Sequence, residues 1–392
     1  MQYRPRLMAL ENDAIAGDVA AAPPPGAVLG NLGPNWFASV MGTGIVANAA
    51  ASLPVHVPGQ RAFAQVVWVI AALLLVALVV TVGAHWVRHP TVARTHARNP
   101  QMAHFYGAAP MALLTVGAGA VLVGHDLIGE RLAVDLDWIL WTAGTLGGLF
   151  TALTIPYLMF TQYSVEPDAA FGGWLMPVVP PMVSAATGAL LIPHMAPGTG
   201  RETMLYGCYA MFGLSLVASL IIITLIWSRL AYYGTSGTAR VPTLWIVLGP
   251  LGQSITAAGL LGTAAAHAVA PEIASGMNVF AILFGVPVWG FAVLWIGLAT
   301  SLTVRTLRRG MPFALTWWSL TFPVGTFVTG TSQLAAHTGL PAFKIAAAVA
   351  YVGLLSTWLL VAVRTARGSL RGNLFQPPPA AGPIRARKDS GV

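Results

Sequence analysis

Long uncharged apolar stretches alternate with short polar connections along most of the chain. Ten such stretches can be counted, at residues 35–51, 62–87, 101–124, 138–161, 171–192, 202–228, 243–267, 276–302, 314–337 and 341–363. About 20 helical residues cross a hydrocarbon core of roughly 30 Å, and all but the first stretch reach that length. The pattern predicts an all-α membrane protein with ten transmembrane helices.

The odd-numbered stretches share a glycine or proline break at a regular interval. The breaks lie 68, 67, 73 and 73 residues apart, at Gly42, Pro110, Pro177, Pro250 and Pro323. Five or six residues before each break there is an aromatic residue or a histidine: Trp36, His104, Phe171, Trp245 and Trp317. A period near 70 that contains two spans indicates a repeated helical hairpin. Five copies predict an inner ring of five kinked helices around a central pore.

The breaks also indicate which helices face inward. Proline removes a backbone N–H and kinks a helix, and in hydrocarbon the freed carbonyl is tolerated only inside protein or beside a cavity. The even-numbered stretches are mostly smooth and aliphatic, which suits an outer, lipid-facing ring, although they contain Pro156 and Pro287. The residues expected to bend the inner helices or line the pore are Gly42, Thr43, Gly44, Pro110, Pro177, Pro250, Gly252, Gln253, Ser254, Pro323 and Thr326.

The amino-acid composition supports the prediction of a membrane protein. Of 392 residues, 56% are hydrophobic and 8% are charged, which is too apolar for a soluble globular protein. Residues 1–30 and 368–392 are rich in Ala and Pro and are predicted to be disordered tails. The membrane domain is therefore expected to span residues 31–367.

The net charge of +8 is explained by topology. If both termini are cytoplasmic, four Lys/Arg lie outside, namely Arg61, Arg131, Arg201 and Lys344, and the other sixteen lie inside. This asymmetry predicts cytoplasmic termini in a multi-pass protein of the cytoplasmic membrane. Anionic lipid headgroups are the expected partners of the basic side, and nucleic acid is not.

The spans as drawn contain no Asp, Glu, Lys or Arg at depth. Such groups usually mark ion sites or proton relays, so their absence disfavours a proton-coupled carrier and a membrane enzyme. The acidic residues of loop 125–137, which are Asp126, Glu130, Asp135 and Asp137, are expected to be solvated outside. A path lined by hydroxyls, amides and broken helix ends, whose N-termini carry partial positive charge, favours small anions.

Neither a metal nor a cofactor is expected. His85, His89 and His96 lie in or beside a basic loop without cysteine or carboxylate, so we expect solvated imidazoles rather than metal ligands. The one cysteine, Cys208, lies within the sixth stretch and is expected to be a packed thiol.

Three motifs in the first, seventh and ninth stretches resemble the tellurite-resistance/dicarboxylate transporter family. They are PNWFASVMGTGI, LGPLGQ and WWSLTFPVG, and the resemblance covers about residues 31–367. That family includes malate permeases, sulfite exporters and the plant slow anion channel. The GPLGQ segment is similar to the malate and sulfite branch.

The resemblance implies five hairpins around a central pore, and a homotrimer with one pore per subunit. It also implies that Phe322, which matches the pore Phe of the ninth helix, is a gate that occludes the pore. The expected function is transport of sulfite, malate, succinate or small inorganic anions, by a channel or a channel-like exporter. A proton-coupled dicarboxylate carrier is the alternative, and a membrane sensor or enzyme that does not transport is a further one.

Overall fold

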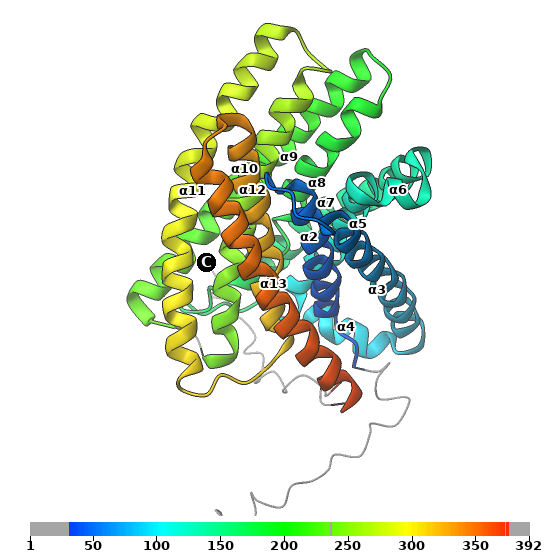
Figure 1. Ribbon diagram of the computed structural model, residues 1–392. Coiled ribbons are helices and arrows are strands. Elements are labelled where there is room, and N and C mark those ends of the chain that lie inside the picture. Colours follow the sequence, from blue (N-terminus) through cyan, green and yellow to red (C-terminus); the bar gives the residue numbers. More distant parts are fainter. Residues whose placement is uncertain (1–30, 236, 373, 376–392) are drawn as a thin grey trace, which may run out of the picture.

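The computed structural model describes residues 31–235, 237–372 and 374–375, and all its regular elements are helices (Figure 1). Most of the two predicted tails, residues 1–30 and 376–392, lies outside the described residues, but the second was predicted to begin at residue 368 and the last helix continues to Leu370. Seven of the described helices are long and apolar enough to cross a membrane. The prediction of an all-helical membrane protein is confirmed.

Five of these seven helices form an outer layer. They are α3 (Gln60–Arg88), α7 (Glu130–Thr161), α9 (Thr199–Tyr233), α11 (Pro271–Leu307) and α13 (Pro341–Leu370). Only 22–28% of the most apolar window of each is buried. Large aliphatic side chains such as Leu73, Leu153 and Leu283 are therefore presented to the surroundings, as expected where lipid is the solvent.

Five shorter helices form the interior, and nearly all their side chains are buried. They are α2 (Phe37–Ser52), α5 (Ala108–Gly119), α8 (Pro180–Leu191), α10 (Leu248–Ala265) and α12 (Phe322–Thr338). Each contacts the next in this order, and α12 contacts α2, so the contacts close on themselves. Each inner helix also packs on the outer helix that follows it in the chain. In Figure 1, α2 and α12 lie in the middle, between α3 and α11.

A 3-10 segment precedes every inner helix. These segments are η1 (Pro34–Trp36), η2 (Ala103–Gly107), η4 (Gly172–Leu175), η6 (Thr238–Val247) and η7 (Leu315–Leu320). They too form a closed series of contacts, from η1 through η2, η4, η6 and η7 back to η1. The aromatic residues noted before each break, such as Trp317, belong to or directly precede these segments.

The predicted mid-helix kinks are wrong in detail. Pro250 is the third residue of α10 and Pro323 the second of α12, so both occupy the first helical turn. Proline is tolerated there because the first N–H groups of a helix have no intrahelical acceptor. Pro110 likewise lies in the first turn of α5, and Pro177 precedes α8. The breaks are therefore junctions between a 3-10 segment and an α-helix, whereas α2 continues through Gly42 without one.

Besides the five outer helices, two continuous helical stretches that include a 3-10 segment reach spanning length, namely Ala103–Ile128 and Thr238–Ala265. The helices α2, α8 and α12 contain 16, 12 and 17 residues. Each is shorter than an 18-residue spanning window.

The remaining elements connect these layers. They are α4 (Pro90–Arg98), the π-helix η3 (Ala120–Gly124), α6 (His125–Ile128) and η5 (Ile192–His194). The π-helix continues α5, and two neighbouring helices donate hydrogen bonds to carbonyls of α5 just before it. Asn48 Nδ2 donates to the Thr115 carbonyl at 3.0 Å, and Trp68 Nε1 donates to the Val116 carbonyl at 2.9 Å.

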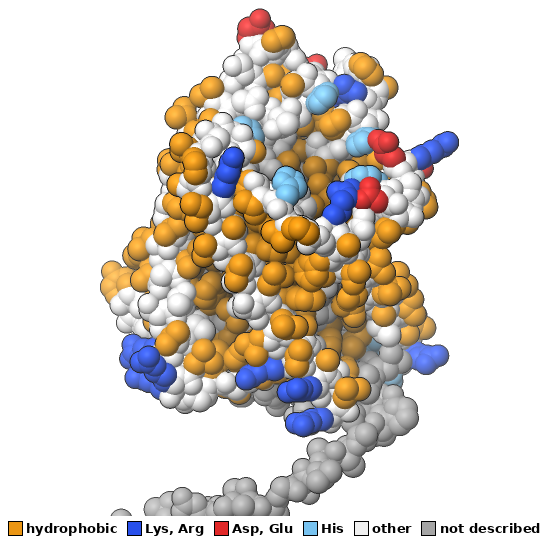
Figure 2. Space-filling view, viewed as in Figure 1, with side chains coloured by type: hydrophobic (Ala, Val, Ile, Leu, Met, Phe, Trp, Pro, Cys, Tyr) orange, Lys and Arg blue, Asp and Glu red, His pale blue; other side chains and the backbone are white. Residues whose placement is uncertain are grey.

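Charged side chains lie mainly at the two ends of the molecule, with a hydrophobic band between them (Figure 2). In the outer helices, Arg88, Arg229, Arg305 and Arg367 lie near C-termini, while Arg61 and Arg131 lie near N-termini. The band supports a multi-pass membrane protein with one strongly basic end.

The expectation of solvated loop histidines is wrong for His85 and His96. His85 and His96 are 1% and 3% exposed, and their rings stack with centroids 5.7 Å apart, while the His89 ring lies 6.0 Å from that of His85. The loop is the short helix α4, which contacts α3 and so covers these side chains. Burial, and then the charge of His85, lower the pKa of His96 below its usual value of 6.5.

This packing predicts that the folded protein loses stability in mild acid. Near pH 6 the unfolded chain protonates His96 while the folded chain resists it, so the contribution of His96 is complete above about pH 6.5 and is lost as pH falls. We expect Tm to fall between about pH 7.5 and about pH 5.5, and to fall less in His96→Phe. An equal fall in the variant would contradict this assignment.

Candidate functional site

A cavity of about 190 Å³ lies among the inner helices, and all five contribute to its wall. Its lining residues come from α2, from α5 and η3, and from α8, α10 and α12: Ile45, Asn48, Ser52, Ala118, Leu122, Ala186, Thr187, Leu190, Gln253, Thr256, Leu260, Thr329 and Gln333. It follows the α-helical halves of these elements, beyond the 3-10 junctions. It is therefore the space that the closed set of inner helices surrounds.

The surface of the cavity is mostly apolar, with several neutral polar side chains and no charged one. The hydroxyls of Thr256 and Thr329 are 2.7 Å apart and share a hydrogen bond between α10 and α12. The amide oxygens of Asn48 and Gln253 are buried and have no hydrogen-bond partner among the described residues. The Asn48 amide nitrogen donates to the Thr115 carbonyl, so Asn48 has its oxygen free, whereas either end of the Gln253 amide can be turned toward a ligand.

Phe322 lies in line with this lining. It is the first residue of α12, is 2% exposed, and precedes Thr329 and Gln333 by seven and eleven residues. Seven residues are about two helical turns and eleven about three, so the three side chains leave α12 on one face. Because α12 begins at the 3-10 junction, Phe322 lies at the N-terminal end of the face of α12 that lines the cavity.

Gly249 extends the same pattern on α10. It lies four residues, about one turn, before Gln253, which lines the cavity. Among the buried glycines that the structure describes, it alone would find no atom within 4 Å of an added Cβ. Unfilled space therefore also lies beside the first turn of α10.

The five inner helices begin near the level of Phe322 and Gly249. Each α-helical half starts just after its 3-10 segment, at Phe37, Ala108, Pro180, Leu248 and Phe322. If consecutive spans alternate in direction, these five helices run the same way, so their N-terminal ends face one level of the interior. Helix N-termini carry about half a positive charge, which favours an anion without any Lys or Arg.

Of the residues predicted to line the pore, only Gln253 lines the cavity. The glycines instead permit close packing of helices. A Cβ on Gly42 would collide with Thr321 and Trp318, one on Gly44 with Thr115, and one on Gly252 with the backbone of α12 at Thr326.

The predicted hydroxyls are used within or between helices. Thr43 Oγ1 accepts a hydrogen bond from Trp358 Nε1 of α13 at 3.2 Å, and so faces the outer layer. Ser254 Oγ donates to the Leu251 carbonyl at 2.8 Å, and Thr326 Oγ1 donates to the carbonyls of Pro323 and Leu248 at 2.7 and 3.1 Å.

Two of the predicted prolines face the outer helix α7. An added Cβ on Gly147 would lie 3.6 Å from Pro110, and the Pro177 carbonyl accepts a hydrogen bond from Thr151 Oγ1 at 3.3 Å. Pro250 and Pro323 are buried in the first turns of their helices. The prolines thus shape the inner elements without lining the cavity.

The missed lining residues follow from helical spacing. Thr256 and Leu260 lie three and seven residues after Gln253, on the same face of α10. Counting by turns from Gln253 and Phe322 would have found the lining of α10 and α12. Without a starting residue of this kind on α2, α5 and α8, their lining faces could not be chosen from sequence.

Two glycines on α10 give a direct test of this packing. We expect Gly252→Ala to destabilise the protein by about 1–3 kcal/mol, because the methyl group meets backbone atoms that cannot rotate away. Gly249→Ala should leave stability nearly unchanged, since its methyl group enters open space. Thermal unfolding of both variants in one detergent checks the contrast, which equal losses would refute.

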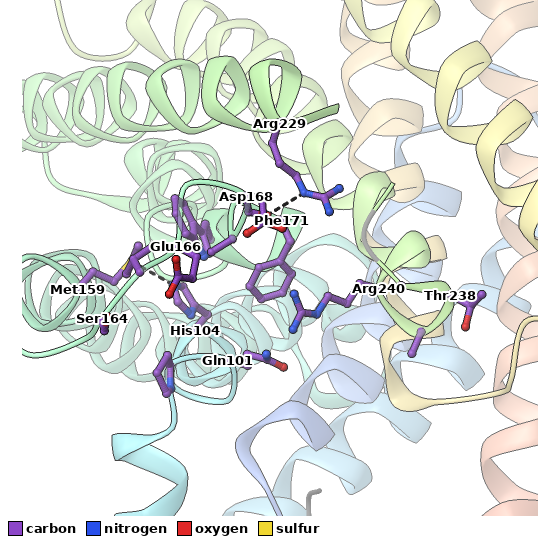
Figure 3. Close-up of a pocket in the computed structure, with 16 residues that line it drawn as sticks. Gln101, His104, Met159, Ser164, Glu166, Asp168, Phe171, Arg229, Thr238 and Arg240 are labelled. Carbon is purple, nitrogen blue, oxygen red and sulfur yellow. Dashed lines mark hydrogen bonds between the residues drawn. The ribbon is translucent and has the colours of Figure 1, made fainter. Parts of the chain in front are cut away.

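A larger pocket, of about 680 Å³, lies at the basic end of the molecule (Figure 3). The guanidinium of Arg240 lies 5.6 Å from the ring centroid of Phe171, and Arg229 Nε donates to the Asp168 carbonyl at 2.9 Å. Because Glu166 and Asp168 also line it, the pocket carries both signs of charge. It lies between three hairpins and lacks contributions from α2 and α12, so it is not the space that the inner helices enclose.

One acidic residue predicted to be solvated is buried. The helix α7 begins at Glu130, eight residues before the expected start of that span, and Asp137 within it is 0% exposed. The expectation that no carboxylate lies inside a span is therefore wrong. No group of three His, Cys, Asp or Glu in the described part of the chain is arranged to hold a metal ion.

The profile of the voltage-dependent anion channel family, SLAC1, matches residues 31–366. A sulfite efflux pump of Trichophyton rubrum is 25% identical over 89% of this chain and 93% of its own. An uncharacterized transporter of Methanocaldococcus jannaschii is 27% identical over 85% of this chain and 90% of its own. A putative malic acid transport protein of Schizosaccharomyces pombe is 20% identical over 87% of this chain and 80% of its own.

These similarities confirm the predicted family resemblance, the transport of anions and the absence of an enzymatic role. They agree with an apolar helical protein whose interior cavity is lined by no charged side chain. The chain belongs to the voltage-dependent anion channel family.

Proposed function

We propose that anions cross the membrane through the space between the five inner helices, and that Phe322 closes this path in the conformation described. The observation that carries the proposal is the cavity to which all five inner helices contribute, with Phe322 on the same face of α12 as Thr329 and Gln333. On this proposal each of the five hairpins contributes two spans, which gives ten spans around a central pore. The 3-10 segments line the narrow half of that pore, and the α-helices line the wider half.

The chemistry of the cavity supports weak binding of a small anion. The Gln253 amide supplies a neutral hydrogen-bond donor, and the five helix N-termini supply partial positive charge. No carboxylate lines the cavity, so no negatively charged side chain there would attract a cation. Weak sites favour throughput, because an ion that binds must also leave.

Sulfite and four-carbon dicarboxylates such as malate and succinate are the proposed substrates, with small inorganic anions beside them. The names of the fungal relatives support the first two classes. Flux of each anion from liposomes that contain the purified protein tests the proposal. Permeation by none of them would reject it.

A channel mechanism fits the path better than a proton-coupled carrier, because no titratable side chain lines the cavity. The two are separated by flux measured with a membrane potential alone and with a pH gradient alone. A channel follows the potential, whereas a coupled carrier requires the pH gradient.

The proposed setting is the cytoplasmic membrane, with both termini in the cytoplasm and the basic end facing inward. The arginines at the C-terminal ends of α3, α9, α11 and α13 support this orientation, and they would also meet anionic headgroups. A homotrimer with one path per subunit is proposed from the resemblance. The mass of the particle in detergent, corrected for bound detergent, tests the trimer.

A further inference from the structure

Asp137 is a fully buried carboxylate in the helix α7. Neither of its carboxylate oxygens has a hydrogen-bond partner among the described residues. Its side chain lies against α5 at Gly117, where an added Cβ would collide with Asp137 Oδ1. The absence of a side chain at Gly117 therefore makes room for this carboxyl group.

The elements packed against α7 offer Asp137 no cation. The helices α5 and α8 and the π-helix η3 contain no ionisable residue at all. On α6, Asp126 is bonded to Arg61 and its Oδ1 lies 3.2 Å from His125 Nε2, and at the start of α7 Glu130 Oε1 lies 3.9 Å from His194 Nδ1. The ionisable groups of η2, His104 and Tyr106, lie beside the opposite end of α7.

An isolated ionised carboxylate is costly in such a place, and the neutral acid is not. Burying an unpaired charge costs several kcal/mol, whereas the protonated acid loses only its hydrogen bonds to water. Ionisable residues within membrane helices usually mark a functional site for this reason. Asp137 is about 10 Å along α7 from Glu130, close enough to that helix end for protons to exchange with water.

The position of Asp137 connects it to the proposed path. Gly117, which it faces, directly precedes Ala118, and Ala118 and Leu122 line the cavity from α5 and η3. The wall between the carboxyl group and the cavity is thus a single helix, part of which has π geometry. Such segments often occur at functional sites and hinges.

The geometry points to Asp137 as a proton-binding site behind the cavity wall, which sets the anion flux according to its protonation. This inference rests on the proposed function, because it needs anions to occupy the cavity. The step is the uptake of one proton from water by the carboxylate, which gives the neutral acid. Loss of that proton places a negative charge about one helix diameter, or about 10 Å, from a passing anion and repels it.

The test compares wild-type protein with Asp137→Asn, which mimics the neutral acid, in liposomes from about pH 5 to about pH 9. We expect the wild-type flux to fall about tenfold as pH rises, and the variant to keep the flux of acidic conditions throughout. Asp135→Asn removes an exposed carboxylate two residues away and should behave like wild type. If Asp137→Asn is not recovered folded, Asp137→Ser is measured in its place.

A second readout does not depend on transport. Infrared difference spectra of the protein at acidic and alkaline pH should contain a carboxylic acid carbonyl band that Asp137→Asn abolishes and Asp135→Asn retains. A pH-independent wild-type flux, or a pH dependence that survives in the Asp137 variant, overturns the inference. If no variant transports at any pH, the proposed function fails, and the infrared band alone then decides whether Asp137 binds a proton.

Discussion

Replacing Phe322 with alanine is expected to raise the anion flux by about tenfold or more, which corresponds to about 1.4 kcal/mol removed from the barrier. Phe322 lies at the N-terminal end of the face of α12 that lines the cavity, and the substitution replaces its ring with a methyl group. A hydrophobic constriction hinders ions because it excludes water, so a smaller side chain should let water and anions through. Anion current across a planar bilayer, or efflux from liposomes, measures the change.

Phe327 provides a matched control on the same helix. It is also buried, but its ring stacks on Trp289 of the outer helix α11, with centroids 6.1 Å apart. Phe327→Ala should therefore cost stability without raising the flux. Unchanged flux in a folded Phe322→Ala protein, or an equal rise in Phe327→Ala, would reject Phe322 as the gate.

Gln253→Glu is expected to lower the anion flux on the order of a hundredfold. The change keeps the size of the side chain but places a carboxylate in a cavity whose lining contains no cation. At about 5 Å and an effective dielectric constant of about 20, the repulsion of a passing anion is about 3 kcal/mol. The flux is measured at alkaline pH, where the new carboxyl group is ionised.

Gln253→Met separates charge from loss of the amide. It removes the hydrogen-bonding group without adding charge, so we expect a much smaller decrease than in Gln253→Glu. Similar losses in both variants would mean that packing rather than electrostatics controls the flux at this position. Retained flux in Gln253→Glu would mean that anions do not pass Gln253.

The sequence predicts the layers of this fold well, because lipid and protein interior select different patterns. Smooth aliphatic stretches such as 62–87 became mostly exposed outer helices, and stretches that carry breaks became buried ones. The regular spacing of Pro110, Pro177, Pro250 and Pro323 identified the inner elements. The sequence does not predict the backbone conformation at these prolines, because a proline that begins an α-helix after a 3-10 segment gives the same sequence pattern as a proline kink within a helix.

The side chains of the site were harder to predict than its helices. Thr43 and Thr326 are polar and adjacent to breaks, as Gln253 is, yet their hydroxyls bond to neighbouring helices. Which face of a helix a residue occupies depends on its neighbours in space, and composition does not contain that information. Asp137 was missed for a similar reason, because the room for its carboxyl group is made by Gly117 on another helix.

The most direct test of the central claim is modification of cysteines placed on two faces of α12. In a Cys208→Ser background with Phe322→Ala, Thr329→Cys would face the path, whereas Thr331 accepts a hydrogen bond from Trp289 of α11 and faces the outer layer. The account predicts that a negatively charged, membrane-impermeant thiol reagent blocks the flux of Thr329→Cys and leaves that of Thr331→Cys unchanged. Block at Thr331→Cys alone, or at neither position, would contradict an anion path between the inner helices.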